Sequence, residues 1–113
     1  MRPDVELLFE REEIARAWAA HGTLGFPPGA AGLEFDGITL ALFCAELAGC
    51  IESFVKDHKL KPIALRIIES SDEHLKVIIP KLNPVAREYF EELESIVSRI
   101  ISFLEQAKRL GLM

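Results

Sequence analysis

Residues 61–81 read KPIALRIIESSDEHLKVIIPK, and the structure of this stretch decides the fold class. Two runs rich in isoleucine and leucine flank the polar segment ESSDE, and Pro62 and Pro80 bracket the whole. Apolar runs on either side of a polar turn are typical of a β-hairpin, so we predict a hairpin over residues 62–80. The alternative is a helix, which would have to hold serines and acidic residues in its middle.

The next segment, residues 83–110, predicts a long helix. Asn83 is a favoured N-cap residue, and Pro84 is favoured at the first helical position. Apolar residues then recur at alternating spacings of four and three, the a/d pattern of a packed helix. The main row is Ala86, Phe90, Leu93, Val97, Ile100, Leu104 and Ala107, and a flanking row holds Tyr89, Ile96, Phe103 and Leu110.

Upstream of the hairpin, the sequence predicts two helices joined by a long loop. Residues 4–21 favour a helix, of which residues 5–9 fit the apolar stripe poorly and could be a short strand. Residues 22–37 hold five of the seven glycines and two adjacent prolines, which is typical of a loop. Residues 38–58 are the most apolar part of the chain and predict a central, buried helix with one narrow polar stripe.

These elements predict a small α+β protein with a single domain over residues 1–113. Its order is an N-terminal helix, a long Gly/Pro loop, a central buried helix, a β-hairpin and a long C-terminal helix. If residues 62–80 are helical instead, the alternative is an all-α bundle.

The net charge and the cysteines indicate which partners and which cellular compartment to expect. The net charge of −5 argues against a nucleic-acid partner, which requires a basic surface. Cys44 and Cys50 lie on one predicted helix and point in different directions, so they cannot form a disulfide with each other. The chain begins with acidic residues where a signal peptide needs an apolar run, and Glu46 interrupts the apolar helix. We therefore expect a cytoplasmic protein without a membrane partner.

The motifs that carry chemistry are weak. GLEFDGIT, residues 32–39, has the glycine spacing of a phosphate-binding loop, but Ile38 stands where that loop needs a lysine. His21, His58 and His74 are not at metal-ligand spacing, so we expect no metal and no cofactor. No catalytic motif is evident, no residue is assigned a catalytic role, and we lean towards a protein that is not an enzyme.

An excess of apolar surface predicts a second subunit. The second face of the predicted hairpin keeps Ile68 and Ile78, and the C-terminal helix is apolar over more than its a/d seam. We therefore expect a protein-interaction or regulatory module that acts as a homodimer. The residues expected at its interface are Ile68, Ile78, Tyr89, Ile96 and Phe103.

The alternative function is that of a small-molecule binding protein. In this hypothesis the Gly/Pro segment, residues 22–37, acts as a gate over an apolar pocket. The candidate ligand-binding residues are Trp18, Phe26, Phe35 and Glu46. An enzyme with Glu46 or a histidine as its base is the third hypothesis.

Overall fold

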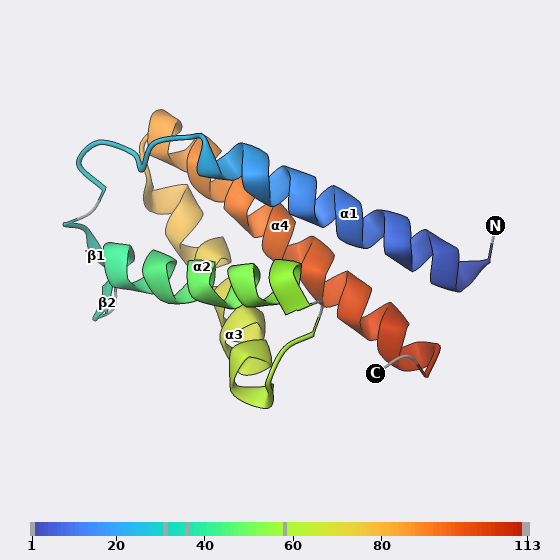
Figure 1. The fold of residues 1–113 in the computed structure, drawn as a ribbon. Helices are drawn as coiled ribbons and strands as arrows, with labels where there is room; N and C mark the ends of the chain where they lie inside the picture. Colours follow the sequence, from blue (N-terminus) through green and yellow to red (C-terminus); the bar gives the residue numbers. More distant parts are fainter. Residues whose placement is uncertain (1, 31, 36, 58, 112–113) are drawn as a thin grey trace.

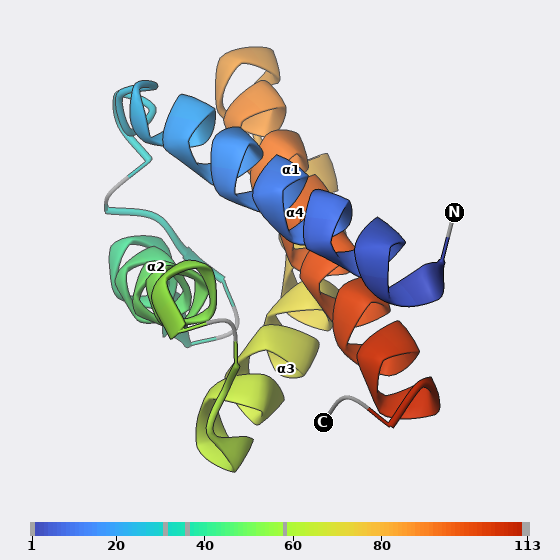
Figure 2. The same cartoon turned by 45° about the vertical axis from the view of Figure 1, so that its right-hand side comes forward.

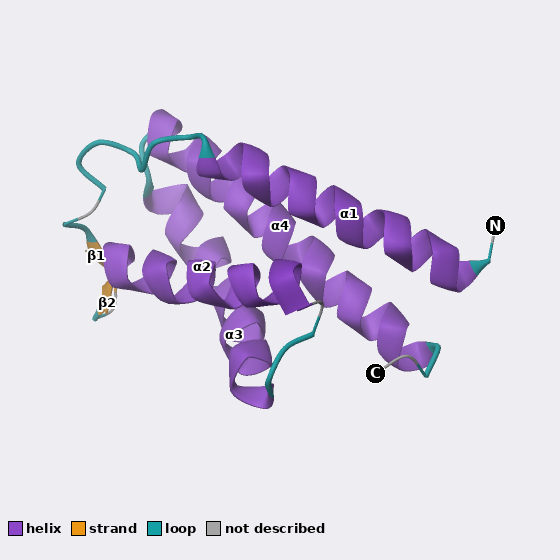
Figure 3. Ribbon diagram, in the orientation of Figure 1, coloured by secondary structure: helices purple, strands orange, loops and turns teal. Residues whose placement is uncertain are grey.

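Four helices and one two-stranded sheet make up the computed structural model, which describes residues 2–30, 32–35, 37–57 and 59–111 (Figures 1 and 3). In chain order the elements are α1 (Pro3–Gly22), β1 (Glu34–Phe35), β2 (Ile38–Thr39), α2 (Leu40–Asp57), α3 (Pro62–Ile78), a 3-10 turn (Ile79–Lys81) and α4 (Pro84–Arg109).

The long helix α4 is the centre of the fold, because both α1 and α3 pack against it. α1 runs antiparallel to α4, so the start of α1 and the end of α4 lie at the same end of the molecule (Figure 1). Arg99 links the two helices by donating a 2.9 Å hydrogen bond from Nε to Glu10. α2 lies beside α3 and α1 (Figure 2), and its Phe54 ring meets Phe103 of α4 edge-on at 5.3 Å.

The apolar pattern predicted for α4 is confirmed. All seven residues of the main row are buried. As predicted, the side chain of Asn83 caps the helix, accepting a 2.9 Å hydrogen bond from the backbone N–H of Ala86. At the other end Gly111 adopts a φ of +73°, a left-handed conformation that favours glycine after a helix.

The hairpin predicted over residues 62–80 is wrong, because Pro62–Ile78 form helix α3. Its buried residues are Ile68, Ser71, Leu75 and Ile78, spaced three and four apart. That spacing places all four on one helical face. Two strands would have distributed the same residues over two faces, whereas the helix turns them all into the core.

The polar residues in the middle of α3 are accommodated in two ways. The hydroxyl of Ser71 is buried but donates a 2.7 Å hydrogen bond to the carbonyl of Ile68, so its burial leaves no unmet donor. Asp72 accepts a 3.0 Å hydrogen bond from Lys76 one turn later. Glu69, Ser70 and Glu73 are exposed. The other carboxylate oxygen of Asp72, Oδ1, is buried without a hydrogen-bond partner among the described residues, so Asp72 is the polar residue whose burial in the helix is only partly compensated.

The strand pairing of this protein lies before α2 rather than after it. β1 and β2 are antiparallel, with Glu34 opposite Thr39 and Phe35 opposite Ile38. Gly37 adopts a φ of +81° in the turn between them, which favours glycine. β1 thus lies in the segment predicted as a loop, residues 22–37. Ile38 and Thr39, predicted as the start of the central helix, instead form β2, and α2 begins at Leu40.

Two further predictions, about the first two helices, need correction. α1 is helical from Pro3 onwards, so the short strand considered at residues 5–9 is wrong. α2 is not buried all round: one face, which includes Leu47, Ile51 and Phe54, is buried, while Leu42 is largely exposed. None of the described helices is both long enough and apolar enough to cross a bilayer.

Most of the residues expected at a subunit interface lie in the core of the chain itself. Ile68, Ile78, Ile96 and Phe103 are buried in the chain's own core, and Tyr89 is half-buried. The apolar excess at these positions is absorbed when α1 and α3 pack on α4. The four buried side chains are therefore not free to meet a second copy, whereas the contact predicted at Tyr89 and the homodimer itself stay predictions.

Candidate functional site

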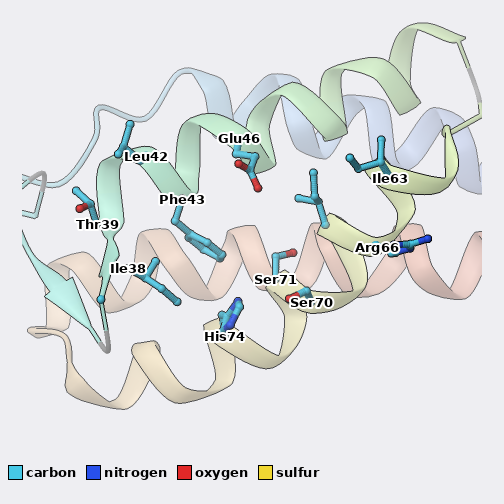
Figure 4. A pocket seen from close by; sticks show the side chains of 12 residues that line it. Ile38, Thr39, Leu42, Phe43, Glu46, Ile63, Arg66, Ser70, Ser71 and His74 are labelled. Carbon is cyan, nitrogen blue, oxygen red and sulfur yellow. The ribbon is translucent and has the colours of Figure 1, made fainter.

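A groove of about 540 Å³ runs between α2 and α3 and is closed at one end by β2 (Figure 4). Its walls combine apolar and polar side chains. The lining residues are Gly37, Ile38, Thr39, Leu42, Phe43, Glu46, Ile63, Arg66, Ile67, Ser70, Ser71 and His74.

Helical periodicity brings these residues together. On α2, Glu46 lies three residues after Phe43 and four after Leu42, which places these side chains on the same side of the helix. On α3, Ile67 lies four residues after Ile63, and His74 lies seven residues, or about two turns, after Ile67. The aromatic ring of Phe43 meets the imidazole of His74 edge-on at 5.9 Å, which joins the two walls at the base of the groove.

Leu42 and Ile63 form apolar lips at opposite ends of the groove (Figure 4). Leu42 is 72% exposed and Ile63 is 68% exposed. A single exposed leucine or isoleucine is ordinary on a protein surface. Both of them border one groove that also contains Ile38, Phe43 and Ile67, so the groove is flanked by exposed apolar side chains at both ends.

The polar side chains of the groove come from both walls and from β2: Thr39, Glu46, Arg66, Ser70, Ser71 and His74. The Glu46, Arg66 and Ser70 side chains are exposed, and none of them forms an ion pair or side-chain hydrogen bond with another described residue. The charges of Glu46 and Arg66 and the hydroxyl of Ser70 are therefore available to a molecule that enters the groove.

The four residues predicted to bind a ligand are not brought together. Glu46 lies in the groove, whereas Phe26 lines a separate hollow of about 470 Å³ with Ala41, Cys44, Ala45 and Tyr89. Phe35 is half-buried, with the ammonium of Lys81 5.8 Å from its ring centre. The indole N–H of Trp18 donates a 2.7 Å hydrogen bond to Glu52 and so ties α1 to α2.

Neither cysteine is activated as a nucleophile. Burial raises the pKa of the Cys44 thiol to about 12. Burial, together with the negative charge of Glu46, raises the pKa of Cys50 as well. Both thiols therefore stay protonated near neutral pH, and a protonated thiol is a poor nucleophile.

His21 is a buried histidine outside the groove, with 3% of its surface exposed. Its ring packs against Tyr89 at 4.3 Å and Trp18 at 5.9 Å. Nδ1 lies 3.5 Å from a carboxylate oxygen of Glu92, which is too long for a good hydrogen bond. A hollow of about 390 Å³ adjoins this histidine between α1 and α4.

No cluster of three or more His, Cys, Asp or Glu side chains able to hold a metal occurs in the described ranges. His21 and His74 lie on different helices, in different cavities. His58, the third histidine considered as a ligand, lies outside the described residues.

The lips of the groove are the part that sequence reasoning missed. Leu42 falls on the predicted polar stripe of its helix, three residues after Thr39 and four before Glu46. An apolar residue within a polar stripe is a signal for an exposed binding residue. Ile63 and Arg66 carried no comparable signal, because the predicted hairpin placed them on strands.

The sequence matches no family model, and comparisons with curated proteins and with solved structures gave no significant match. Function therefore has to be inferred from the geometry of the groove and from the side chains that line it.

Proposed function

We propose that the protein is a non-enzymatic protein-interaction module that acts as a homodimer, with the α2–α3 groove as its docking surface. The exposure of Leu42 and Ile63 at the two ends of the groove carries this proposal. Burial of a leucine or isoleucine side chain contributes roughly 1.5–3 kcal/mol, so covering both lips favours association.

The surface area of the chain is larger than that of a compact monomer. Its accessible surface is 7081 Å², whereas a monomer of its mass is expected to expose about 6200 Å². The excess of about 900 Å² goes with an elongated shape of 45 × 25 × 22 Å, which leaves more surface exposed than a compact monomer does. The radius of gyration of 14.5 Å also exceeds the roughly 13 Å of a compact domain of this length.

We place the homodimer in the cytoplasm. Cys44 and Cys50 are both free, and both lie on α2. A reducing compartment keeps such thiols unpaired.

The test measures association in variants of the two lips. Leu42→Glu and Ile63→Glu each put a charge at the rim of the groove, so either change should convert a dimer into a monomer in sedimentation equilibrium. Val85→Glu is the matched control, because Val85 is 71% exposed and does not line the groove. A wild-type chain that stays monomeric across a concentration series would refute the homodimer.

A second candidate function is small-molecule binding in the hollow beside Phe26. Phe26 lies in the segment predicted as a gate and packs edge-on against Tyr89 at 5.7 Å and Phe90 at 6.0 Å. The volume of about 470 Å³ lies within the roughly 300–1,000 Å³ of ligand sites. Cys44 and two alanines of α2 complete an apolar wall.

Native mass spectrometry separates this function from the first. A retained molecule that is lost in Phe26→Ala, but kept in Phe35→Ala, would support a gated pocket. Phe35 is the control because it is half-buried and lies outside the hollow. If no sample retained a bound molecule, the result would contradict small-molecule binding.

A further inference from the structure

The α2–α3 groove carries one acidic and one basic side chain on its two walls. Glu46 projects from α2 towards α3, and Arg66 lies on α3 near the end of the groove marked by Ile63 (Figure 4). Both side chains are exposed, and neither is paired with another charged side chain in the described ranges.

We propose, building on the homodimer proposed above, that two copies join groove to groove about a two-fold axis. In this arrangement Arg66 of each copy pairs with Glu46 of the other, and the lips Leu42 and Ile63 of each copy are covered by the opposite groove. The occupant of the groove is thus a second copy of this chain.

The symmetry of a homodimer gives the reason for this pairing. A two-fold axis brings a surface patch against itself, so a contact between residue i and residue j occurs twice. A patch with charges of one sign would repel its copy. The groove has one acid and one base at separate places, so the two-fold arrangement joins opposite charges in both contacts.

The charge of the whole chain makes such pairs important. Each copy carries a net charge of −5, so two copies repel each other at long range. Two contacts between Arg66 and Glu46 oppose this repulsion at close range and fix the register of the copies. The apolar lips supply the surface that is removed from water.

Charge reversal tests the pairing. Glu46→Arg or Arg66→Glu alone should weaken the dimer by about tenfold or more, because each change places like charges in both contacts. The double variant, Glu46→Arg with Arg66→Glu, should restore association. Mixing the two single variants should also restore it, because every contact then joins opposite charges.

The controls separate this pairing from folding and from overall charge. Glu88→Arg on α4 makes the same change in net charge at an exposed position outside the groove, and should have a much smaller effect. Circular dichroism of each variant should show the same helix content as the wild type. Sedimentation equilibrium of the single, double and mixed samples then gives the association constants.

The outcomes distinguish the pairing from the proposed function. A dimer that is sensitive to Leu42→Glu but is not rescued by the double variant or by mixing would overturn the pairing and leave the homodimer standing. A wild-type chain that never associates would overturn both, and would leave the groove to a different protein. Rescue in both the double and the mixed sample would establish the pairing.

Discussion

The imidazole of His21 is buried without a hydrogen-bond partner for either ring nitrogen among the described residues. Such a group costs a protein about 1–3 kcal/mol relative to a satisfied or apolar one. Its neighbours Trp18 and Tyr89 are aromatic, so a phenyl ring suits the same place.

We therefore predict that His21→Phe raises the free energy of unfolding by about 1 kcal/mol, measured by urea denaturation. Glu92→Gln is the companion variant and should change stability little. A loss of stability in both variants would instead show that His21 and Glu92 form a stabilising bond in solution.

The half-buried thiol of Cys44 should make stability depend on pH. The folded chain holds its pKa at about 12, against an ordinary value of 9. A raised pKa means that the folded state keeps a proton that the unfolded state releases, so its contribution to stability is full below pH 9 and declines above it. Wild-type protein should therefore lose more stability between neutral and strongly alkaline pH than Cys44→Ala.

Thermal unfolding monitored at several pH values would measure this difference. Tyr89 also has a raised pKa, mainly through burial, and acts in the same direction. The charge of the Cys44 thiolate adds to this shift, so the effect of Tyr89 cancels only in its burial part, and the remainder adds to the loss of stability expected for the wild type. Identical pH profiles would show that the thiol is solvated in the folded protein.

Helix α2 contains a glycine that weakens it. Gly49 lies in the helix interior, is exposed, and has open space around the position of an added Cβ. Glycine in a helix costs roughly 0.5–1 kcal/mol relative to alanine. Gly49→Ala should stabilise the protein by about that amount in denaturant titrations.

At Gly37 we expect the same substitution to have the opposite effect on stability. It also has open space around it, but its φ of +81° strains any other side chain. Gly37→Ala should therefore destabilise the protein, although the added methyl group is the same. Equal effects of the two changes would contradict the assignment of Gly37 to the turn between β1 and β2.

The sequence of helix α3, taken alone, is compatible with a turn as well as with a helix. ESSDE favours a turn when taken alone, because Ser and Asp compete for backbone hydrogen bonds. The spacing of Ile68, Leu75 and Ile78 and the pair Asp72–Lys76 favour a helix. Packing against α4 decided between them, since a helix buries these three apolar residues on one face.

In the bundle as a whole, α2 packs mainly against α3 and also contacts α1, and its Phe54 reaches α4. The Phe54 side chain is fully buried and meets Phe103 of α4, while Trp18 bonds to Glu52 at the surface. Removing a buried phenylalanine side chain typically costs about 3–5 kcal/mol. The position of α2, and with it one wall of the groove, therefore depends on Phe54.

We predict that Phe54→Ala lowers the free energy of unfolding by about 3–5 kcal/mol in urea titrations and also weakens self-association. Phe9→Ala is the matched control, because Phe9 is 55% exposed and lies on α1 away from the groove. A small effect of Phe54→Ala would show that α2 is docked mainly through α3.

Elements with a local pattern can be predicted from the amino-acid sequence. The row from Ala86 to Ala107, the cap at Asn83 and the helical character of α1 and α2 all follow from spacing and propensity within one segment. How residues 62–78 fold and where the apolar excess goes depend instead on long-range packing. Those answers depend on which surfaces meet: α3 and α1 cover α4, so the expected interface residues Ile68 and Phe103 became core. The groove likewise could not be predicted from the sequence, because its two walls come from helices whose relative placement no local pattern specifies.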